Sequence, residues 1–186
     1  MTLARPLRKF RSRLRRFARD RSGVTAVEFA IVVPFMLLAY IGGNELGNGL
    51  AIKYRVTLAA RTVTDLASQY VSIDGATMSS ILNASSSVIA PYSSANMVVT
   101  VSEITTDANG QGTVTWSDSL NGTPRTVGSS VTLPTALQTP SISLIWGEVT
   151  YPYQPVGGYF LTGTINFYQS TYFYPRLSSS IACNGC

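Results

Sequence analysis

The sequence predicts an α+β protein, in which one long N-terminal helix packs on a small antiparallel β-sheet. A basic segment ends at Gly23, an apolar run follows at once, and short β-type runs separated by turn residues fill the rest. A helix on one face of an antiparallel sheet is an α+β layer arrangement. We therefore expect a basic cytoplasmic leader at residues 1–23, a transmembrane helix continuing into an amphipathic helix at 24–70, and an extracytoplasmic β-rich domain at 71–186.

Positive charge is concentrated at the start of the chain. Nine of the fourteen Lys and Arg residues lie in the first 22 positions, and the rest of the chain holds five basic and eight acidic residues. A basic tail that runs directly into an apolar segment is typical of a membrane protein whose N-terminus stays in the cytoplasm. The later residues show no basic patch and no nucleic-acid module, so we expect no nucleic-acid partner.

The apolar segment Val24–Ile41 predicts one transmembrane helix, with the lipid bilayer as its partner. Eighteen helical residues span about 27 Å, close to the roughly 30 Å of a hydrocarbon core. A cleaved signal peptide is the alternative, but its apolar core is usually about 7–15 residues long. The charge asymmetry then leaves the C-terminal domain outside the cytoplasm.

Glu28 is the unusual residue of this span. A charge at the centre of a membrane helix costs about 2.5–3.5 kcal/mol on insertion scales, and less near the interface. Either Glu28 is shallow and reaches toward Arg19 or Arg21, or it has a specific partner.

The run from Arg21 to Phe29 resembles a type IV prepilin processing site. In that family a basic leader ends in Gly, a peptidase cuts after it, and a glutamate is the fifth mature residue. The resemblance implies cleavage between Gly23 and Val24, with Glu28 at that fifth position. Major type IV pilins usually carry Phe where this chain has Val24, a departure that bears on methylation after cleavage and not on cleavage itself.

The wider pattern resembles the TadE-like proteins, the minor pseudopilins of tight-adherence pilus systems. It adds Pro34, Glu45-Leu46-Gly47, Tyr151–Pro155 and Tyr174–Ser178. The resemblance implies a structural component of pilus assembly in the bacterial inner membrane, facing the periplasm. Its implied partners are a prepilin peptidase, other pilus-assembly proteins and other pseudopilins. Cleavage would create an α-amino group at Val24, with an ordinary pKa of about 7.7–8.0, that Glu28 of a neighbouring subunit could pair with.

Two helical features follow the span. Four glycines between Gly42 and Gly49 predict either a hinge or locally melted stretch, or close packing of small residues. Beyond them, apolar residues recur at spacings of three and four, which predicts a helix face that packs on the sheet or makes subunit contacts. These residues are Leu50, Tyr54, Thr57, Ala60, Val63, Ala67 and Tyr70.

The remaining residues predict a short helix and three or four antiparallel strands. A hairpin is expected around Asp107–Gly110, a strong turn signal. The expected helix is Thr77–Ile89, and the expected strands are Asn96–Thr105, Gly112–Ser117, Ile142–Tyr153 and a last strand, Thr171–Tyr174 with Leu177–Ala182, interrupted at Pro175. Tyr159–Tyr168 is ambiguous between helix and strand.

No enzymatic site, cofactor or metal is expected. The chain has no histidine, its carboxylates form no paired motif, and its serines lack a nucleophile elbow. Cys183 and Cys186 predict a local disulfide outside the cytoplasm, because the βαβ context of a redox motif is absent. The alternative function is an uncleaved single-pass protein with an extracytoplasmic binding or adhesion domain, whose aromatic-rich C-terminal region could contact a ligand.

Overall fold

The structure, a computed structural model, describes residues 22–155 and 163–186. The leader up to residue 21, with Arg19 and Arg21, and the first part of Tyr159–Tyr168 lie outside the described residues. The chain forms two compact units, Met1–Asn44 and Glu45–Cys186. Helix α2 (Ser22–Ser68) begins in the first unit and ends in the second.

The first unit contains the apolar half of α2. Its side chains are exposed on all faces: Val27 is 60%, Phe29 68% and Phe35 69% exposed. A helix that is apolar all round and unburied needs an apolar solvent, and its length and composition suit a membrane. Within the part of the chain that the structure describes, it is the one helix of this kind, as expected for a single-pass membrane protein.

In the second unit α2 is one-sided. Ile52, Val56, Ala60, Val63 and Ala67 are buried against the sheet. The predicted stripe is therefore correct from Ala60 to Ala67, whereas its last residue, Tyr70, lies beyond the end of α2 and is 40% exposed.

Before Ala60 the predicted stripe does not pack on the sheet, because Leu50 is 68% and Tyr54 70% exposed, and the alternative of subunit contacts stays a prediction there. Residues on one face of a helix recur every three or four positions, so either Thr57 or Val56 can precede Ala60 on the buried face. The large side chains of Leu50 and Tyr54 favoured Thr57 in the prediction. In the structure Val56 is buried instead, and Ile52 and the small residue Gly49 lie on the buried face with it.

The glycine-rich stretch is helical throughout, which excludes the melted alternative. A Cβ on Gly49 would lie 3.7 Å from the ring of Tyr153, so this glycine is closely packed. A Cβ on Gly43 or Gly47 would meet no atom within 4 Å.

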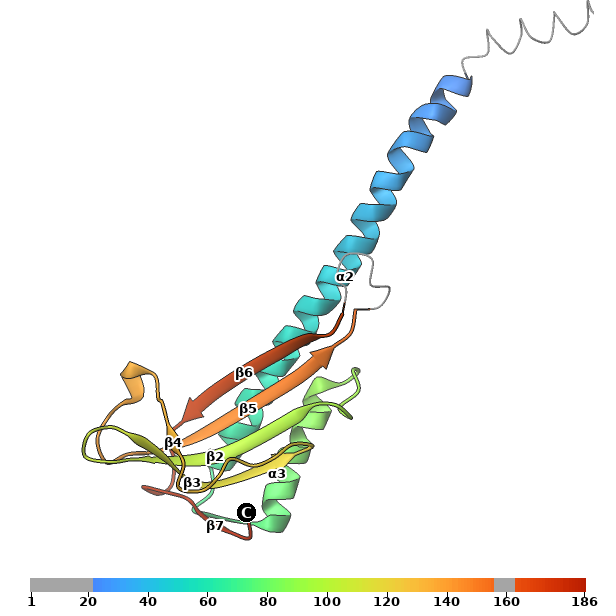
Figure 1. Ribbon diagram of the computed structural model, residues 1–186. Coiled ribbons are helices and arrows are strands. Elements are labelled where there is room, and N and C mark those ends of the chain that lie inside the picture. Colours follow the sequence, from blue (N-terminus) through green and yellow to red (C-terminus); the bar gives the residue numbers. More distant parts are fainter. Residues whose placement is uncertain (1–21, 156–162) are drawn as a thin grey trace, which may run out of the picture. The chain divides into compact units, whose positions relative to one another are not determined.

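A five-stranded antiparallel sheet forms the body of the second unit, in the order β4-β3-β2-β5-β6 (Figure 1). The predicted hairpin and the long strand after it are confirmed, and β4 and β6 complete the sheet. The strands are β2 (Val98–Thr106), β3 (Gly112–Leu120), β4 (Ser130–Val131), β5 (Ser143–Tyr153) and β6 (Ile165–Phe173), with the 3-10 helix η1 (Thr135–Leu137) before β5.

Helix α3 (Gly75–Ile89) confirms the predicted short helix. Its N-cap is Asp74, whose carboxylate accepts a 2.7 Å hydrogen bond from the backbone N–H of Thr77. Met78, Ile81 and other buried residues of α3 join the cluster formed by α2, β2, β3 and β5, so both helices contribute to the core on one face of the sheet.

Only the first part of the predicted last strand is confirmed: residues 171–173 form the end of β6, whereas residues 177–181 are not a strand. β6 ends at Phe173, and β7 (Ala182–Asn184) instead pairs in parallel with β1 (Ser72–Asp74) in a separate two-stranded sheet. Two buried side chains form hydrogen bonds with the backbone of the segment between β6 and β7. The N–H of Ile181 donates to Glu103 over 2.7 Å, and its carbonyl accepts a 2.6 Å bond from the indole of Trp116.

Helix and sheet approach most closely at Gly147 of β5. A Cβ there would lie 1.9 Å from Oγ1 of Thr64 and 3.2 Å from the carbonyl oxygen of Ala60. Thr64 is fully buried, and its hydroxyl donates a 2.6 Å bond to that same carbonyl. The contact therefore needs a residue without a side chain.

We expect Gly147→Ala to lower the free energy of unfolding by about 1–3 kcal/mol, because α2 must move off β5. Chemical unfolding of the full chain in detergent, followed by near-UV circular dichroism, measures this. Gly47→Ala is the matched control and should keep or raise stability by about 0.5–1 kcal/mol, as an open mid-helix glycine. Equal stability of the two variants would contradict the close contact.

Candidate functional site

The residues of the predicted processing site lie at the start of α2. The helix begins at Ser22, so the Gly23–Val24 bond lies in its first turn. Val24 is 58% exposed, and a Cβ on Gly23 would meet nothing within 4 Å. The packing of the described residues therefore does not require a glycine at position 23.

Glu28 lies four residues after Val24, on the same face of the helix and one turn further on. It is exposed, as are its neighbours on the helix. The structure therefore brings Val24 and Glu28 to one face. Arg19 and Arg21, the alternative partners of Glu28, are outside the described residues.

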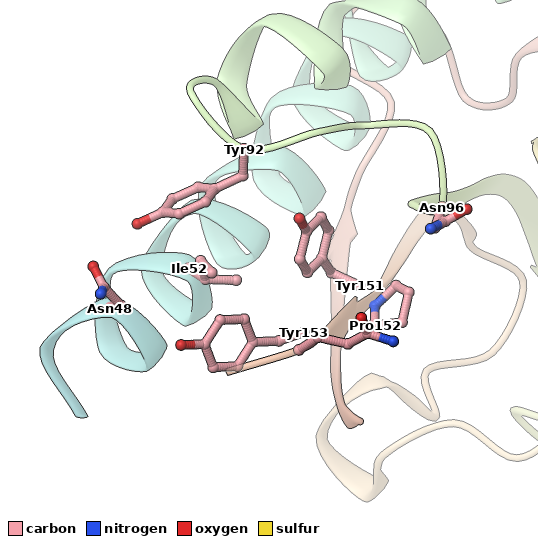
Figure 2. Close-up of a pocket in the computed structure, with 8 residues that line it drawn as sticks. Asn48, Ile52, Tyr92, Asn96, Tyr151, Pro152 and Tyr153 are labelled. Carbon is pink, nitrogen blue, oxygen red and sulfur yellow. The ribbon is translucent and has the colours of Figure 1, made fainter. Parts of the chain in front are cut away.

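The second unit contains a cleft of about 460 Å³ that sequence reasoning did not find, which we name the tyrosine cleft (Figure 2). Three segments form it: α2, the turn after α3, and the end of β5. Its lining residues are Asn48, Ile52, Tyr92, Asn96, Tyr151, Pro152, Tyr153 and Gln154.

Tyr153 is the most buried tyrosine of the cleft. The residue is 5% exposed, and its hydroxyl has no hydrogen-bond partner among the described residues. Burial raises its pKa, with a smaller contribution from the negative charge of Glu45. Its ring stacks on Phe167 with centroids 5.9 Å apart, which fixes its position.

Tyr92 forms the opposite wall. Its hydroxyl and that of Tyr153 point toward the same side of the cleft as Asn48 (Figure 2). The guanidinium of Arg55 lies 6.0 Å from the centroid of the Tyr92 ring and donates a 3.1 Å bond to the carbonyl of Val88 at the end of α3. Arg55 therefore stabilises both the Tyr92 ring and the turn after α3 that contains Tyr92.

The model of the TadE-like protein family matches residues 23–65. Over this segment the chain is similar to the TadE-like proteins. The match begins at Gly23 and includes the exposed apolar half of α2 and most of its packed half. Comparisons with curated proteins and with solved structures found no match. The family match and the membrane-type helix together support a membrane protein associated with tight-adherence pili.

A C-terminal motif of the resemblance docks onto the TadE-like segment. The side chain of Arg176 forms an ion pair with Asp65, and its backbone N–H donates a 2.9 Å bond to the carbonyl of Ser68. The last turn of α2 is therefore capped by the Tyr174-Pro175-Arg176 run, about a hundred residues away in sequence.

Cys183 and Cys186 are joined to each other in the structure, with Cα atoms 5.8 Å apart. Cys183 lies on β7, opposite Ile73 of β1, and packs partly against the main core. A loop this short removes little entropy from the unfolded chain, so its contribution to stability is small.

A polar cluster on the other face of the sheet centres on Glu148. Arg125 donates two bonds to its carboxylate, over 2.6 and 2.8 Å, and the hydroxyl of Tyr168 donates a third over 2.6 Å. The Arg125 guanidinium also lies 3.9 Å from the centroid of Trp146, which stacks on Tyr172. Because Arg125 belongs to the segment between β3 and β4, the cluster holds this segment on the sheet.

We expect Tyr168 to titrate late. Burial, then its bond to Glu148, raises its pKa from 10.0 to about 12. A raised pKa means that this group's contribution to stability is complete below about pH 10 and is lost as the pH rises through about 12. The phenolate absorbance that Tyr168→Phe removes should have its midpoint near this higher value.

Glu148→Gln is the matched control for this titration. Removing the negative charge should bring the Tyr168 midpoint closer to 10.0. A wild-type midpoint already near 10.0 would contradict the described hydrogen bond.

Proposed function

We propose that this chain is a pseudopilin-like component of tight-adherence pilus assembly. It spans the bacterial inner membrane once, with its N-terminus in the cytoplasm, and a prepilin peptidase cuts it after Gly23. The observation that carries this proposal is the family match starting at Gly23, on a helix whose apolar half is exposed on all faces.

Open space around Gly23 supports the processing step. Since no neighbour among the described residues excludes a side chain there, a requirement for glycine would come from the peptidase that binds this segment. Cleavage releases the basic leader and leaves Val24 as the new N-terminus, one helical turn from Glu28.

The new amino group and Glu28 provide opposite charges at the edge of the membrane. Charged groups in a bilayer are tolerated best when paired. Pairing between neighbouring subunits would favour one stagger of their helices, which gives Glu28 a role in assembly.

The outward face of α2 in the second unit supports contacts with other pilus proteins. Leu46, Leu50 and Tyr54 are spaced by four residues and are 59%, 68% and 70% exposed. An exposed apolar ridge of this kind is suited to packing against another helix. The chain then acts through assembly, with no chemistry of its own.

An uncleaved membrane-anchored binding protein is the second candidate. The tyrosine cleft favours it, because a cleft lined by aromatic rings and a few polar groups is typical of a ligand site. The mature N-terminus separates the two candidates.

For the processing step we expect Gly23→Trp to block maturation. The wild-type chain isolated from membranes should lack the mass of residues 1–23 and begin at Val24, whereas the variant should keep its full mass. Intact-mass spectrometry with N-terminal sequencing measures both. A Gly23→Trp chain that still loses the leader mass would falsify the cleavage proposal, and Gly47→Ala is the control that should be processed normally.

For the pairing step we expect Glu28→Ala to leave cleavage intact but to reduce the number of assembled pili at least about tenfold, as for loss of one buried charge pair. Pili are counted by electron microscopy. Val27→Ala, at a neighbouring exposed position, should assemble normally. Unchanged pilus number in Glu28→Ala would remove Glu28 from the assembly account.

A further inference from the structure

We propose that the tyrosine cleft binds a neutral saccharide of the size of a mono- or disaccharide. This site lies wholly within the second unit and does not depend on whether the leader is cut.

No charged side chain is among the lining residues in the part of the chain that the structure describes. The buried floor is apolar and aromatic, formed by Ile52, Tyr151 and Tyr153, and the carboxamides of Asn48, Asn96 and Gln154 stand at the exposed rim. A tyrosine hydroxyl and a carboxamide each both donate and accept hydrogen bonds. Sugar hydroxyls do the same, so the lining suits a neutral polyhydroxyl ligand.

The Tyr153 hydroxyl is an independent indication that the cleft binds a ligand. A buried polar group normally has a partner, and one without a partner is unfavourable. This hydroxyl has none among the described residues, although Tyr153 is held rigidly by its stack on Phe167. The hydroxyl is covered in this structure, so a ligand hydroxyl would reach it and satisfy it only after the rim side chains move, while the tyrosine ring faces would contact the apolar C–H face of a sugar ring.

The register of β5 argues against an extended peptide as the ligand. β2 pairs with β5 only up to the Val98–Thr150 pair, so β5 continues past β2 where it lines the cleft. On the other side, β6 pairs with the same stretch through Pro152–Asn166 and Tyr153–Ile165. Pro152 has no N–H, and an added strand beside it would lack a donor.

The volume agrees with this ligand class. At about 460 Å³ the cleft falls within the range of roughly 300–1,000 Å³ of small-ligand sites.

Titration of the purified full-length chain with chitobiose and with cellobiose tests the proposal. The micelles must be made from a detergent without a sugar headgroup, because such a headgroup would compete for the cleft. Binding is measured by isothermal calorimetry and by saturation-transfer NMR. We expect at least one of the two disaccharides to bind, and Tyr153→Phe to weaken that binding about tenfold, as for loss of one buried hydrogen bond.

Tyr54→Phe is the matched control, because Tyr54 is 70% exposed on α2 and does not line the cleft. Its affinity should equal that of the wild type. Asn96→Ala, a variant at the rim, provides a second test that leaves the buried floor intact, and it should also bind more weakly.

Three results would overturn the proposal. They are no binding of either disaccharide up to about 10 mM, equal affinity of wild type and Tyr153→Phe, or binding of a proline-rich peptide at the cleft in place of both sugars. None of these changes the mass of the mature chain, so a failure here is distinguishable from a failure of the processing proposal.

Discussion

The second unit depends on the close approach of α2 to β5 at Gly147. Small residues on both sides, Ala60 on the helix and Gly147 on the strand, let the two backbones come together. This contact fixes which face of α2 is buried, and so turns Leu46, Leu50 and Tyr54 outward. It also brings the end of β5 beside Gly49 and Ile52, where the floor of the tyrosine cleft forms.

Elements encoded by local signals were predictable from the sequence. The carboxylate of Asp107 accepts 2.8 Å bonds from the N–H groups of Asn109 and Gln111, which is the local chemistry of a turn, and Asp74 caps α3 in the same local way. Both carboxylates have lowered pKa values because of these backbone hydrogen bonds.

Features that depend on distant residues were not predictable. The partners of Ile181, which are Glu103 and Trp116, lie 78 and 65 residues away, so no local pattern reports the end of the β6 strand or the β1–β7 pair. The tyrosine cleft likewise needs α2, Tyr92 and β5 together. Of its lining residues, only the Tyr151–Gln154 run belonged to a motif that was recognised from the sequence. The N-terminal part of the family resemblance, by contrast, rests on residues close together in sequence at the start of α2, so it was visible from the sequence alone.

Helix α2 lies in two different environments, lipid before Asn44 and the sheet after it. Single cysteines placed along α2, in a chain whose Cys183 and Cys186 are replaced by Ser, can be labelled in membranes with a water-soluble maleimide. Positions from Phe29 to Ile41 should all remain unlabelled. Beyond them, Leu50 and Tyr54 should label strongly, whereas Ile52 and Val56 should not. Labelling with a helical period between Phe29 and Ile41, or uniform labelling beyond Leu46, would contradict the account.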